Sequence, residues 1–199
     1  LQPMMDSWFL SRTSETAAAG VGALMPVLGA LFMAIQAFSQ AGASIASQFL
    51  GAERKRQAGV TQSMVLAGSL LLGIAITLIV IPLANQIISW MGLTGEAAKH
   101  AKDFLHIVSF GFAFRSLQTT LTALIATHGL TIWNLFGNIF TILSNFVLNI
   151  VFLNGLFGLP KMGVEGVALA TMLSWLISSF ILFLVLHFKI QHRFKRSDW

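Results

Sequence analysis

The chain has 199 residues, of which 56% are hydrophobic and only 10% are charged, and its mean hydropathy is +0.80. This composition excludes an ordinary soluble domain, and the absence of cysteine excludes disulfides and thiolate metal sites. The net charge of +5 lies in short basic clusters beside apolar segments, not on a basic surface that alternates with aromatic residues, so we expect no nucleic-acid binding.

Six apolar segments follow one another along the chain, and a helix of about 20 residues can cross a hydrocarbon core of about 30 Å. The predicted spans are residues 1–11 (the outer end of a truncated first helix), 17–50, 60–83, 104–127, 132–153 and 167–188. The more polar segment 85–103 is expected to lie along the membrane surface. The predicted fold class is therefore all-α, a polytopic transmembrane helical bundle.

The charges of the connecting loops predict how the chain crosses the membrane. The loops after the second, fourth and sixth spans carry basic residues in excess over Glu53 and Asp198, namely Arg54, Lys55, Arg56, Lys189, Arg193, Lys195 and Arg196. The other loops carry as many acids as bases. The positive-inside rule places the first set and the C-terminal end of the chain in the cytoplasm, in a bacterial inner (plasma) membrane.

The segment 132–153 carries a stripe of polar side chains. Its members are spaced 4, 3, 4 and 4 residues apart, so they share one face of a helix: Asn134, Asn138, Thr141, Asn145 and Asn149. Buried amides in a membrane face either another helix or a wet cavity. Each Asn alone fits helix–helix hydrogen bonding, but five polar residues in one stripe favour the wall of a polar cavity.

Two other segments carry small or polar residues at helical spacing. In the span 17–50 four polar residues recur at a spacing of four: Gln36, Gln40, Ser44 and Gln48. Cavity lining and helix packing are equally good interpretations of this pattern. We retain Gln36 and Gln40 as candidate cavity-lining residues. In the span 60–83, Ser69, Gly73 and Thr77 form a small-residue seam that predicts close helix packing.

Two charged residues, Asp6 and Arg115, fall inside predicted spans. An arginine at a helix centre costs about 2.5–3.5 kcal/mol on insertion scales, so Arg115 is expected to face the interior and find a partner. It is either a structural residue held by backbone carbonyls and Asn amides, or a gating or substrate-site charge with Asp6 as a candidate partner. Asp6 is either a capping or interfacial acid, or an acid kept in the membrane for a function.

Other chemistry finds no support in the sequence. His100, Asp103 and His106 lie close on a helical surface, but their position at the end of a span favours a solvated turn over a metal site. The HExxH, P-loop, GxSxG and dinucleotide-binding signatures are absent. We therefore predict no enzyme, no catalytic residues, no metal and no cofactor.

Four stretches, in order along about 190 residues, resemble the multidrug and toxic compound extrusion (MATE) transporters. They are MMDSWFLSR (4–12), AGASIASQFLGAERKRQA (41–58), ATHGLT (126–131) and NFVLNIVFLNGLFGLPKMGVEGVALAT (145–171). The resemblance implies twelve helices in two six-helix lobes, which export organic cations in exchange for H⁺ or Na⁺. This chain is similar to the N-terminal lobe, with most of its first helix and the C-terminal lobe absent.

The resemblance assigns roles to three residues. Asp6 matches the ionisable first-span Asp that is implicated in ion coupling, and Asn145 and Asn149 match two fifth-span positions. Many members have a second Asp where this chain has Asn149. The proline that is usual in the middle of the fourth span is missing here, and Ala113 and Arg115 lie in that region. An acid that is alone in a low-dielectric cavity takes up a proton readily, which suits alternating access.

The expected partners are the lipid bilayer, a small-molecule substrate and the missing C-terminal lobe. Three alternatives remain. Arg115 is compatible with a flippase for lipid-linked oligosaccharides of the same superfamily, which would hold an anionic headgroup. The small-residue seams are compatible with a non-transporting membrane subunit. An intramembrane enzyme would need a catalytic pair that the sequence does not supply.

Overall fold

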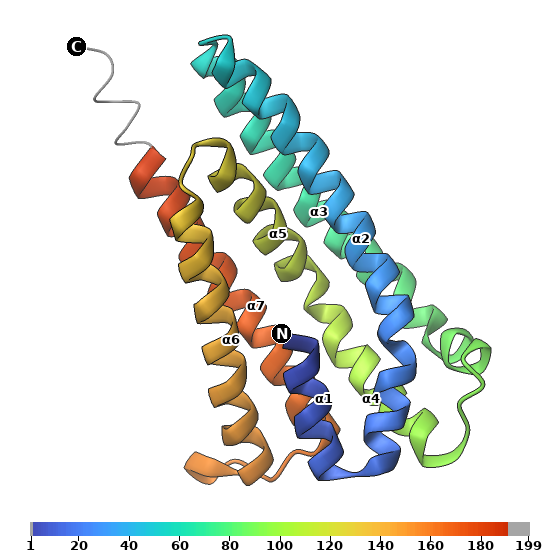
Figure 1. The fold of residues 1–199 in the computed structure, drawn as a ribbon. Coiled ribbons are helices and arrows are strands. Elements are labelled where there is room, and N and C mark those ends of the chain that lie inside the picture. The colour runs from blue at the N-terminus through green and yellow to red at the C-terminus, as the bar shows by residue number, and fades with distance from the viewer. Residues whose placement is uncertain (1, 191–199) are drawn as a thin grey trace.

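A computed structural model describes residues 2–190 as a bundle of helices, and among these residues there is no β-strand (Figure 1). The helices are α1 (Gln2–Thr13), α2 (Glu15–Gly51), α3 (Lys55–Trp90), α4 (Gly95–Phe110), α5 (Phe112–Thr127), α6 (Thr131–Asn154) and α7 (Val164–Val185). Two short turns complete it, the 3₁₀ turn η1 (Leu156–Gly158) and the π turn η2 (Leu186–Ile190). The all-α class predicted from the composition is confirmed.

Four helical segments are long and apolar enough to cross a membrane, counted over residues 2–190: α2, α3, α6 and the segment Val164–Lys189. The two longest, α2 and α3, have 37 and 36 residues. At 1.5 Å per residue each is about 55 Å long, well beyond a hydrocarbon core of about 30 Å. The hairpin of α2 and α3 therefore extends past the other helices at one end of the bundle (Figure 1).

The chain between α3 and α5 differs from the predicted segments. Residues 85–90, expected in a surface segment, are the last turns of α3, and α4 already begins at Gly95. The predicted span 104–127 is divided between α4 and α5, which meet at Gly111. There the Gly111 N–H donates to Val108 O at 2.8 Å, a bond over three residues instead of four. A Cβ on Gly111 would lie 3.0 Å from the Met172 and Trp175 side chains, so glycine also lets α7 pack closely.

The small-residue seam of α3 packs against this junction. A Cβ on Gly73 would lie 2.5 Å from the Ala113 Cα, so only glycine allows the two backbones to approach this closely. The Thr77 hydroxyl donates to Ser109 O at 2.6 Å, and Ser69 is buried. The packing role predicted for the seam is confirmed. The seam holds α3 against the junction of α4 and α5, close to Arg115.

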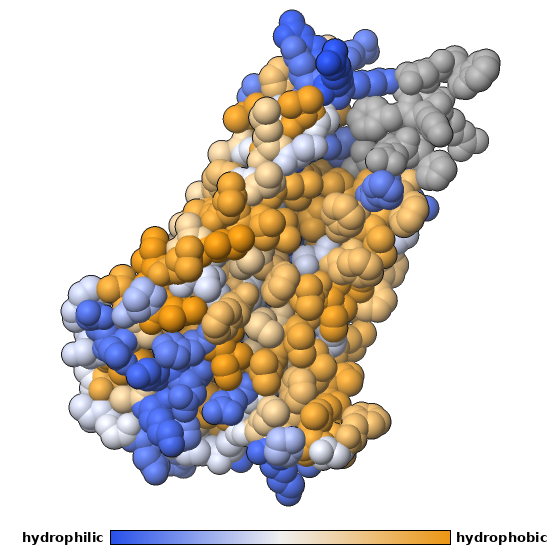
Figure 2. Space-filling model, turned by 180° about the vertical axis from the view of Figure 1, so that it is seen from behind, coloured by the Kyte–Doolittle hydropathy of each residue, from blue (hydrophilic) through white to orange (hydrophobic). Residues whose placement is uncertain are grey.

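The surface has the polarity of a membrane protein. A broad apolar band covers the middle of the molecule and separates two hydrophilic ends (Figure 2). The α2–α3 hairpin tip, the α5–α6 turn and η2 lie at one end, and the turns after α1, α3 and α6 lie at the other (Figure 1). Described basic residues Arg54, Lys55, Arg56 and Lys189 belong to the first end, while Arg193, Lys195, Arg196 and Asp198 lie outside the described residues. The chain is a multi-pass membrane protein.

Candidate functional site

Asp6 is buried inside the bundle, where three side chains from two other helices donate hydrogen bonds to its carboxylate. It is 4% exposed. Its Oδ1 accepts from Asn145 Nδ2 at 3.2 Å and from Asn149 Nδ2 at 3.5 Å, and its Oδ2 accepts from the Thr171 hydroxyl at 3.0 Å. The acid of α1 is thus held by neutral donors of α6 and α7, and none of these contacts is with a cationic side chain.

The donors of this site are themselves ordered by hydrogen bonds. Asn145 and Asn149 are one helical turn apart on α6, and Asn149 Nδ2 also donates to Asn145 Oδ1 at 3.1 Å. Asn145 Nδ2 also donates to the Thr171 hydroxyl at 3.2 Å. The second amide oxygen, Asn149 Oδ1, is buried and has no hydrogen-bond partner. A buried acceptor without a donor is costly, so it is available to a bound cation or a proton.

We call these four residues, Asp6, Asn145, Asn149 and Thr171, the Asp6 cluster. The polar stripe predicted from the sequence supplies two of them, Asn145 and Asn149, and both donate hydrogen bonds to Asp6. Thr171 was not predicted. The signal was present in part, because Thr171, Ser174 and Ser178 are spaced three and four apart and all are buried.

A second polar cluster surrounds Gln118 on α5. Its Nε2 donates to the Thr141 hydroxyl at 2.8 Å and to the Ser178 hydroxyl at 3.0 Å, which joins α5 to α6 and α7. Its Oε1 accepts from Arg115 Nη1 at 3.0 Å. We call Arg115, Gln118, Thr141 and Ser178 the Gln118 cluster.

Arg115 is held by contacts other than the partners that the sequence suggested. Its guanidinium carbon lies over the Phe32 ring at 5.2 Å and the Trp175 ring at 5.8 Å from the centroids. Within residues 2–190 its hydrogen bond goes to the Gln118 amide, and it forms no ion pair with Asp6. The hypothesis of a direct Asp6–Arg115 pair is therefore wrong for this conformation. Cation–π contacts and a side-chain amide take the place of the expected backbone carbonyls and asparagines.

A cavity of about 390 Å³ lies between the two clusters. Asp6 and Thr171 line it from the first cluster, and Arg115, Gln118 and Thr141 line it from the second. Most of the remaining wall is apolar, with Phe32, Phe104 and Trp175 among its members. One acid and one base therefore face a shared space within a size range that accepts small ligands.

The other predicted cavity residues have different places. Asn138 is exposed and lines this cavity together with Thr141. Asn134 is buried and donates from Nδ2 to Thr122 O at 2.9 Å, which is a helix–helix contact. Gln36 and Gln40 are exposed on α2 and do not line the cavity, so a cavity-lining role for them stays a prediction.

The arrangement around Asp6 can exchange a small cation. The carboxylate of Asp6 meets two amide nitrogens and one hydroxyl, all of which donate to it, and the carboxylate and hydroxyl oxygens are of the hard type that suits a proton or a Na⁺-like cation. Uptake of either would change the hydrogen bonds between α1 and the helices α6 and α7.

Comparison with known proteins gives a consistent family. Residues 1–151 match the family model described as MatE. The uncharacterized transporter YisQ of Bacillus subtilis (strain 168) is 29% identical over 187 residues, which cover 94% of this chain and 41% of YisQ. The probable multidrug resistance protein NorM of the same organism is 28% identical over 183 residues, 92% of this chain and 40% of NorM.

Solved structures agree on the fold. A MATE structure in the bent conformation superposes with a TM-score of 0.85 at 25% identity, over 95% of this chain and 41% of that one. An inward-facing multidrug resistance MATE transporter of the MOP superfamily gives a TM-score of 0.86 at 23% identity, over 93% and 41%. A MOP superfamily transporter from Pyrococcus furiosus, described as having a binding pocket of reverse polarity, gives 0.83 at 25% identity, over 94% and 41%. The chain spans about two fifths of the length of the relatives it matches.

Proposed function

The chain belongs to the MatE family, and from this premise we propose that it forms the N-terminal six-helix lobe of a transporter that exports small molecules by alternating access in exchange for a coupling ion. The relatives described as transporters and multidrug resistance proteins support export as the activity. The substrate expected from that likeness is an organic or cationic compound. A second lobe, absent from this chain, would supply the facing wall of the transport path.

The Asp6 cluster carries this proposal. Burying a carboxylate in a membrane bundle costs free energy, so its presence there favours a functional role. Asp6 accepts hydrogen bonds from neutral donors only, so binding H⁺ or Na⁺ breaks no ion pair. Protonation would turn one carboxylate oxygen into a donor, for which the unpartnered Asn149 Oδ1 is an available acceptor. Sodium would instead be held by the Asp6 carboxylate, with the Asn145 and Asn149 side chains turned so that their amide oxygens replace the nitrogens that now face it.

Either ion would favour a different set of contacts between α1 and the pair α6 and α7. An ion can shift a two-state equilibrium only by binding one state more tightly than the other. The hydrogen bonds of Asp6 supply such a difference, because they connect α1 to both α6 and α7. Ion release on one side of the membrane would therefore be linked to a change in the side to which the cavity opens.

The test is ion-driven flux in proteoliposomes that contain the complete protein, under separate proton and sodium gradients. Asp6→Asn keeps the size of the side chain, removes its charge and exchanges one acceptor oxygen for a donor nitrogen. We expect a loss of ion-driven efflux of at least about tenfold, with an unchanged fold. The matched control is Asp103→Asn, since Asp103 lies on α4 outside the cavity. Undiminished flux in the Asp6 variant would overturn the proposal, and the gradient that drives wild-type flux identifies the ion.

Arg115 favours a second candidate, transport of an anionic substrate such as a lipid-linked oligosaccharide. It lines the cavity, and within the described residues no carboxylate pairs with it. A cationic substrate beside it would be repelled. Paired assays with a cationic and an anionic fluorescent substrate separate the two functions: if Arg115→Gln lowers only anion transport, the flippase-like function is favoured. An absence of flux for every substrate, in wild-type protein, would favour a non-transporting subunit.

We further propose that the end with the α2–α3 hairpin tip faces the cytoplasm of a bacterial inner membrane. Arg54, Lys55 and Arg56 support this orientation through the positive-inside rule. The chain contains no cysteine, so single cysteines can report it. In intact cells an impermeant maleimide should label Glu165→Cys and leave Ala52→Cys unlabelled, once any cysteine outside this chain has been replaced. The reverse pattern would invert the topology.

A further inference from the structure

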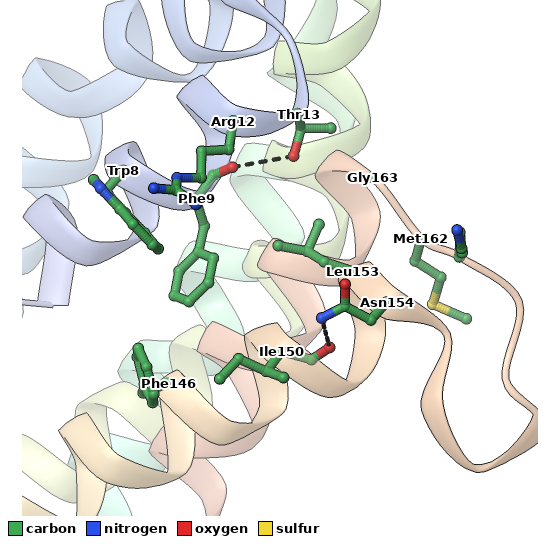
Figure 3. Close-up of a pocket in the computed structure, with 11 residues that line it drawn as sticks. Trp8, Phe9, Arg12, Thr13, Phe146, Ile150, Leu153, Asn154, Met162 and Gly163 are labelled. Atoms are coloured by element: carbon green, nitrogen blue, oxygen red, sulfur yellow. Dashed lines mark hydrogen bonds between the residues drawn. The ribbon is translucent and has the colours of Figure 1, made fainter.

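A second, larger cavity of about 610 Å³ opens where α1, α6 and the loop after α6 meet (Figure 3). Trp8, Phe9 and Arg12 line it from α1, and Phe146 and Ile150 line it from α6. The loop supplies Lys161, Met162 and Gly163. The Asp6 cluster and the 390 Å³ cavity do not include any of these residues. We call this space the interfacial groove.

The charges of the interfacial groove have one sign. Arg12 and Lys161 are the charged residues among those that line it, and both are exposed. The acids at this end of the bundle, Glu15 and Glu165 among them, do not line it. Arg12 packs over the Trp8 ring, with its guanidinium carbon 4.2 Å from the centroid, and within residues 2–190 it has no ion-pair partner. The groove is therefore complementary to an anion.

The loop after α6 holds Lys161 at the level of the membrane interface. It folds back on the helix, because Met162 N donates to Phe152 O at 2.9 Å and Gly155 adopts a positive φ of 66°. A Cβ on Gly155 would lie 2.7 Å from Leu159 O, so the fold-back needs glycine. The same loop exposes three large apolar residues, Leu156, Phe157 (91% exposed) and Leu159. Such residues beside a lysine are typical of a segment that rests in the headgroup region.

The groove becomes apolar toward the middle of the membrane. A neighbouring apolar hollow of about 360 Å³ shares Trp8, Phe9 and Phe146 with it and extends along α1 to Met4 and Met5. Both α1 and α6 run toward the same end of the bundle, so their polar ends coincide there (Figure 1). From Arg12 to Met4 the wall covers eight residues, or about 12 Å of helix. Arg12 and Lys161 lie at the polar end of the groove, and aromatic and methionine side chains line its apolar end.

We propose that the interfacial groove binds an anionic phospholipid, whose phosphate lies between Arg12 and Lys161 and whose acyl chain lies along Phe146 toward Met4. Cationic pockets at a membrane interface attract acidic headgroups, and each Lys or Arg adds to the preference over a zwitterionic lipid. The continuous apolar wall then distinguishes a lipid from a free anion. The lipid would link α1 to the loop after α6 and so support the helix that carries Asp6.

The test uses Trp8 as its own reporter, because Trp8 lines both parts of the groove and is half-exposed. The complete protein is reconstituted in phosphatidylcholine nanodiscs that contain an increasing fraction of either brominated-chain phosphatidylglycerol or brominated-chain phosphatidylcholine. The Trp8 signal is the difference between this protein and its Trp8→Phe variant. We expect the brominated phosphatidylglycerol to quench Trp8 at about tenfold lower lipid fraction than the brominated phosphatidylcholine.

Two variant pairs define the outcome. Arg12→Gln with Lys161→Gln should abolish the preference for phosphatidylglycerol, and both residues are exposed, so the fold is expected to persist. Lys99→Gln with Lys102→Gln is the matched control, since these lysines lie at the same end on α4 and should leave the preference intact. Flux is not the readout, so the result is independent of the proposed transport activity.

Four results would overturn the proposal. Equal quenching by the two lipids would mean ordinary bilayer contact, and an equal effect of both variant pairs would mean a diffuse charge effect. Removal of the preference by soluble inorganic phosphate at low millimolar concentration would mean a free-anion site. Absence of quenching by either lipid would mean that protein, such as a second lobe, covers the groove.

Discussion

Two polar clusters share the helices α6 and α7, and they hold charges of opposite sign, from α1 and α5, in different ways. The Asp6 cluster surrounds its acid with three neutral donors. In the Gln118 cluster, counted over residues 2–190, the base donates one hydrogen bond, to Gln118, and lies near the faces of two aromatic rings. Both charges line the cavity between the clusters.

This difference indicates what each charge can do. The Asp6 carboxylate depends on hydrogen bonds, so any gain or loss of a proton or cation changes the contacts of three helices. The Arg115 guanidinium is stabilised by ring faces that are insensitive to protonation of a neighbour, and an arginine stays charged in proteins. We therefore expect the first cluster to switch and the second to remain a fixed positive wall.

The largest effect on stability is expected for Asn145→Leu. Asn145 donates to Asp6 and Thr171 and accepts from Asn149, so leucine removes three hydrogen bonds and leaves a buried acid short of a donor. The free energy of unfolding in mixed micelles should fall by about 2 kcal/mol, since hydrogen bonds to charged groups exceed neutral ones. Asn138→Leu is the control on the same helix and should stay within about 0.5 kcal/mol, because Asn138 is exposed. Similar losses in both variants would contradict the special role of Asn145.

A smaller effect is expected for Gln118→Leu in the second cluster. The Thr141 and Ser178 hydroxyls each keep a partner without Gln118, because both also donate to Gly137 O, at 2.8 and 3.3 Å. Arg115 loses its hydrogen bond to Gln118 but keeps its contacts with two aromatic rings. The loss in unfolding free energy should be about 1 kcal/mol by the same measurement. Thr122→Val on the same helix is the control, since its hydroxyl donates only within α5, to Gln118 O. A cost for Gln118→Leu as large as that for Asn145→Leu would remove the contrast between the clusters.

The sequence predicted the first cluster better than the second for physical reasons. A carboxylate such as Asp6 is rare in an apolar segment, and the asparagines repeat at helical spacing, so both features are visible in the sequence. Thr171 does not, because hydroxyls in apolar helices commonly satisfy themselves on the preceding turn, as Ser174 does with Thr171 O at 2.7 Å. The sequence suggested Asp6, on a distant segment, as a partner of Arg115, whereas its hydrogen-bond partner is Gln118, three residues along the same helix.

The helices themselves were predicted in number and order more closely than in extent. Apolar length identifies a membrane segment but not always where it ends: α2 was predicted nearly in full as 17–50, whereas α3 was predicted as 60–83 and extends from Lys55 to Trp90. Gly111 divides α4 from α5, yet glycine is common in membrane helices and carries no break signal of its own. The reason for the break lies in tertiary structure, where Gly111 contacts α7.

Thr171→Val tests the contribution of α7 to the Asp6 cluster. The variant removes the donor to Asp6 Oδ2 and the acceptor of Asn145 Nδ2, while it keeps the shape of the side chain. Interhelical hydrogen bonds in membranes contribute about 0.6 kcal/mol on average, so stability should change little. The apparent affinity for the coupling ion, from flux against ion concentration, should fall about threefold. Thr171→Ser restores the hydroxyl and should recover it, and a valine variant with wild-type affinity would exclude α7 from ion binding.

The smallest effect is expected where the clusters face each other across the cavity. Asp6 and Arg115 each have their own partners and form no ion pair, so Asp6→Asn and Arg115→Gln should act on unfolding free energy almost independently. A double-mutant cycle should give a coupling energy below about 0.5 kcal/mol, as for sites without shared partners. The reference cycle joins Arg115→Gln with Gln118→Leu, whose direct 3.0 Å hydrogen bond should give a larger value.

Exchange of the two charges, Asp6→Arg with Arg115→Asp, should not restore flux, because the three donors around position 6 and the rings around position 115 suit only the charge that each now holds. A coupling above about 1 kcal/mol, or rescue by the exchange, would show that the two clusters act as one ion pair in some state of the transport cycle.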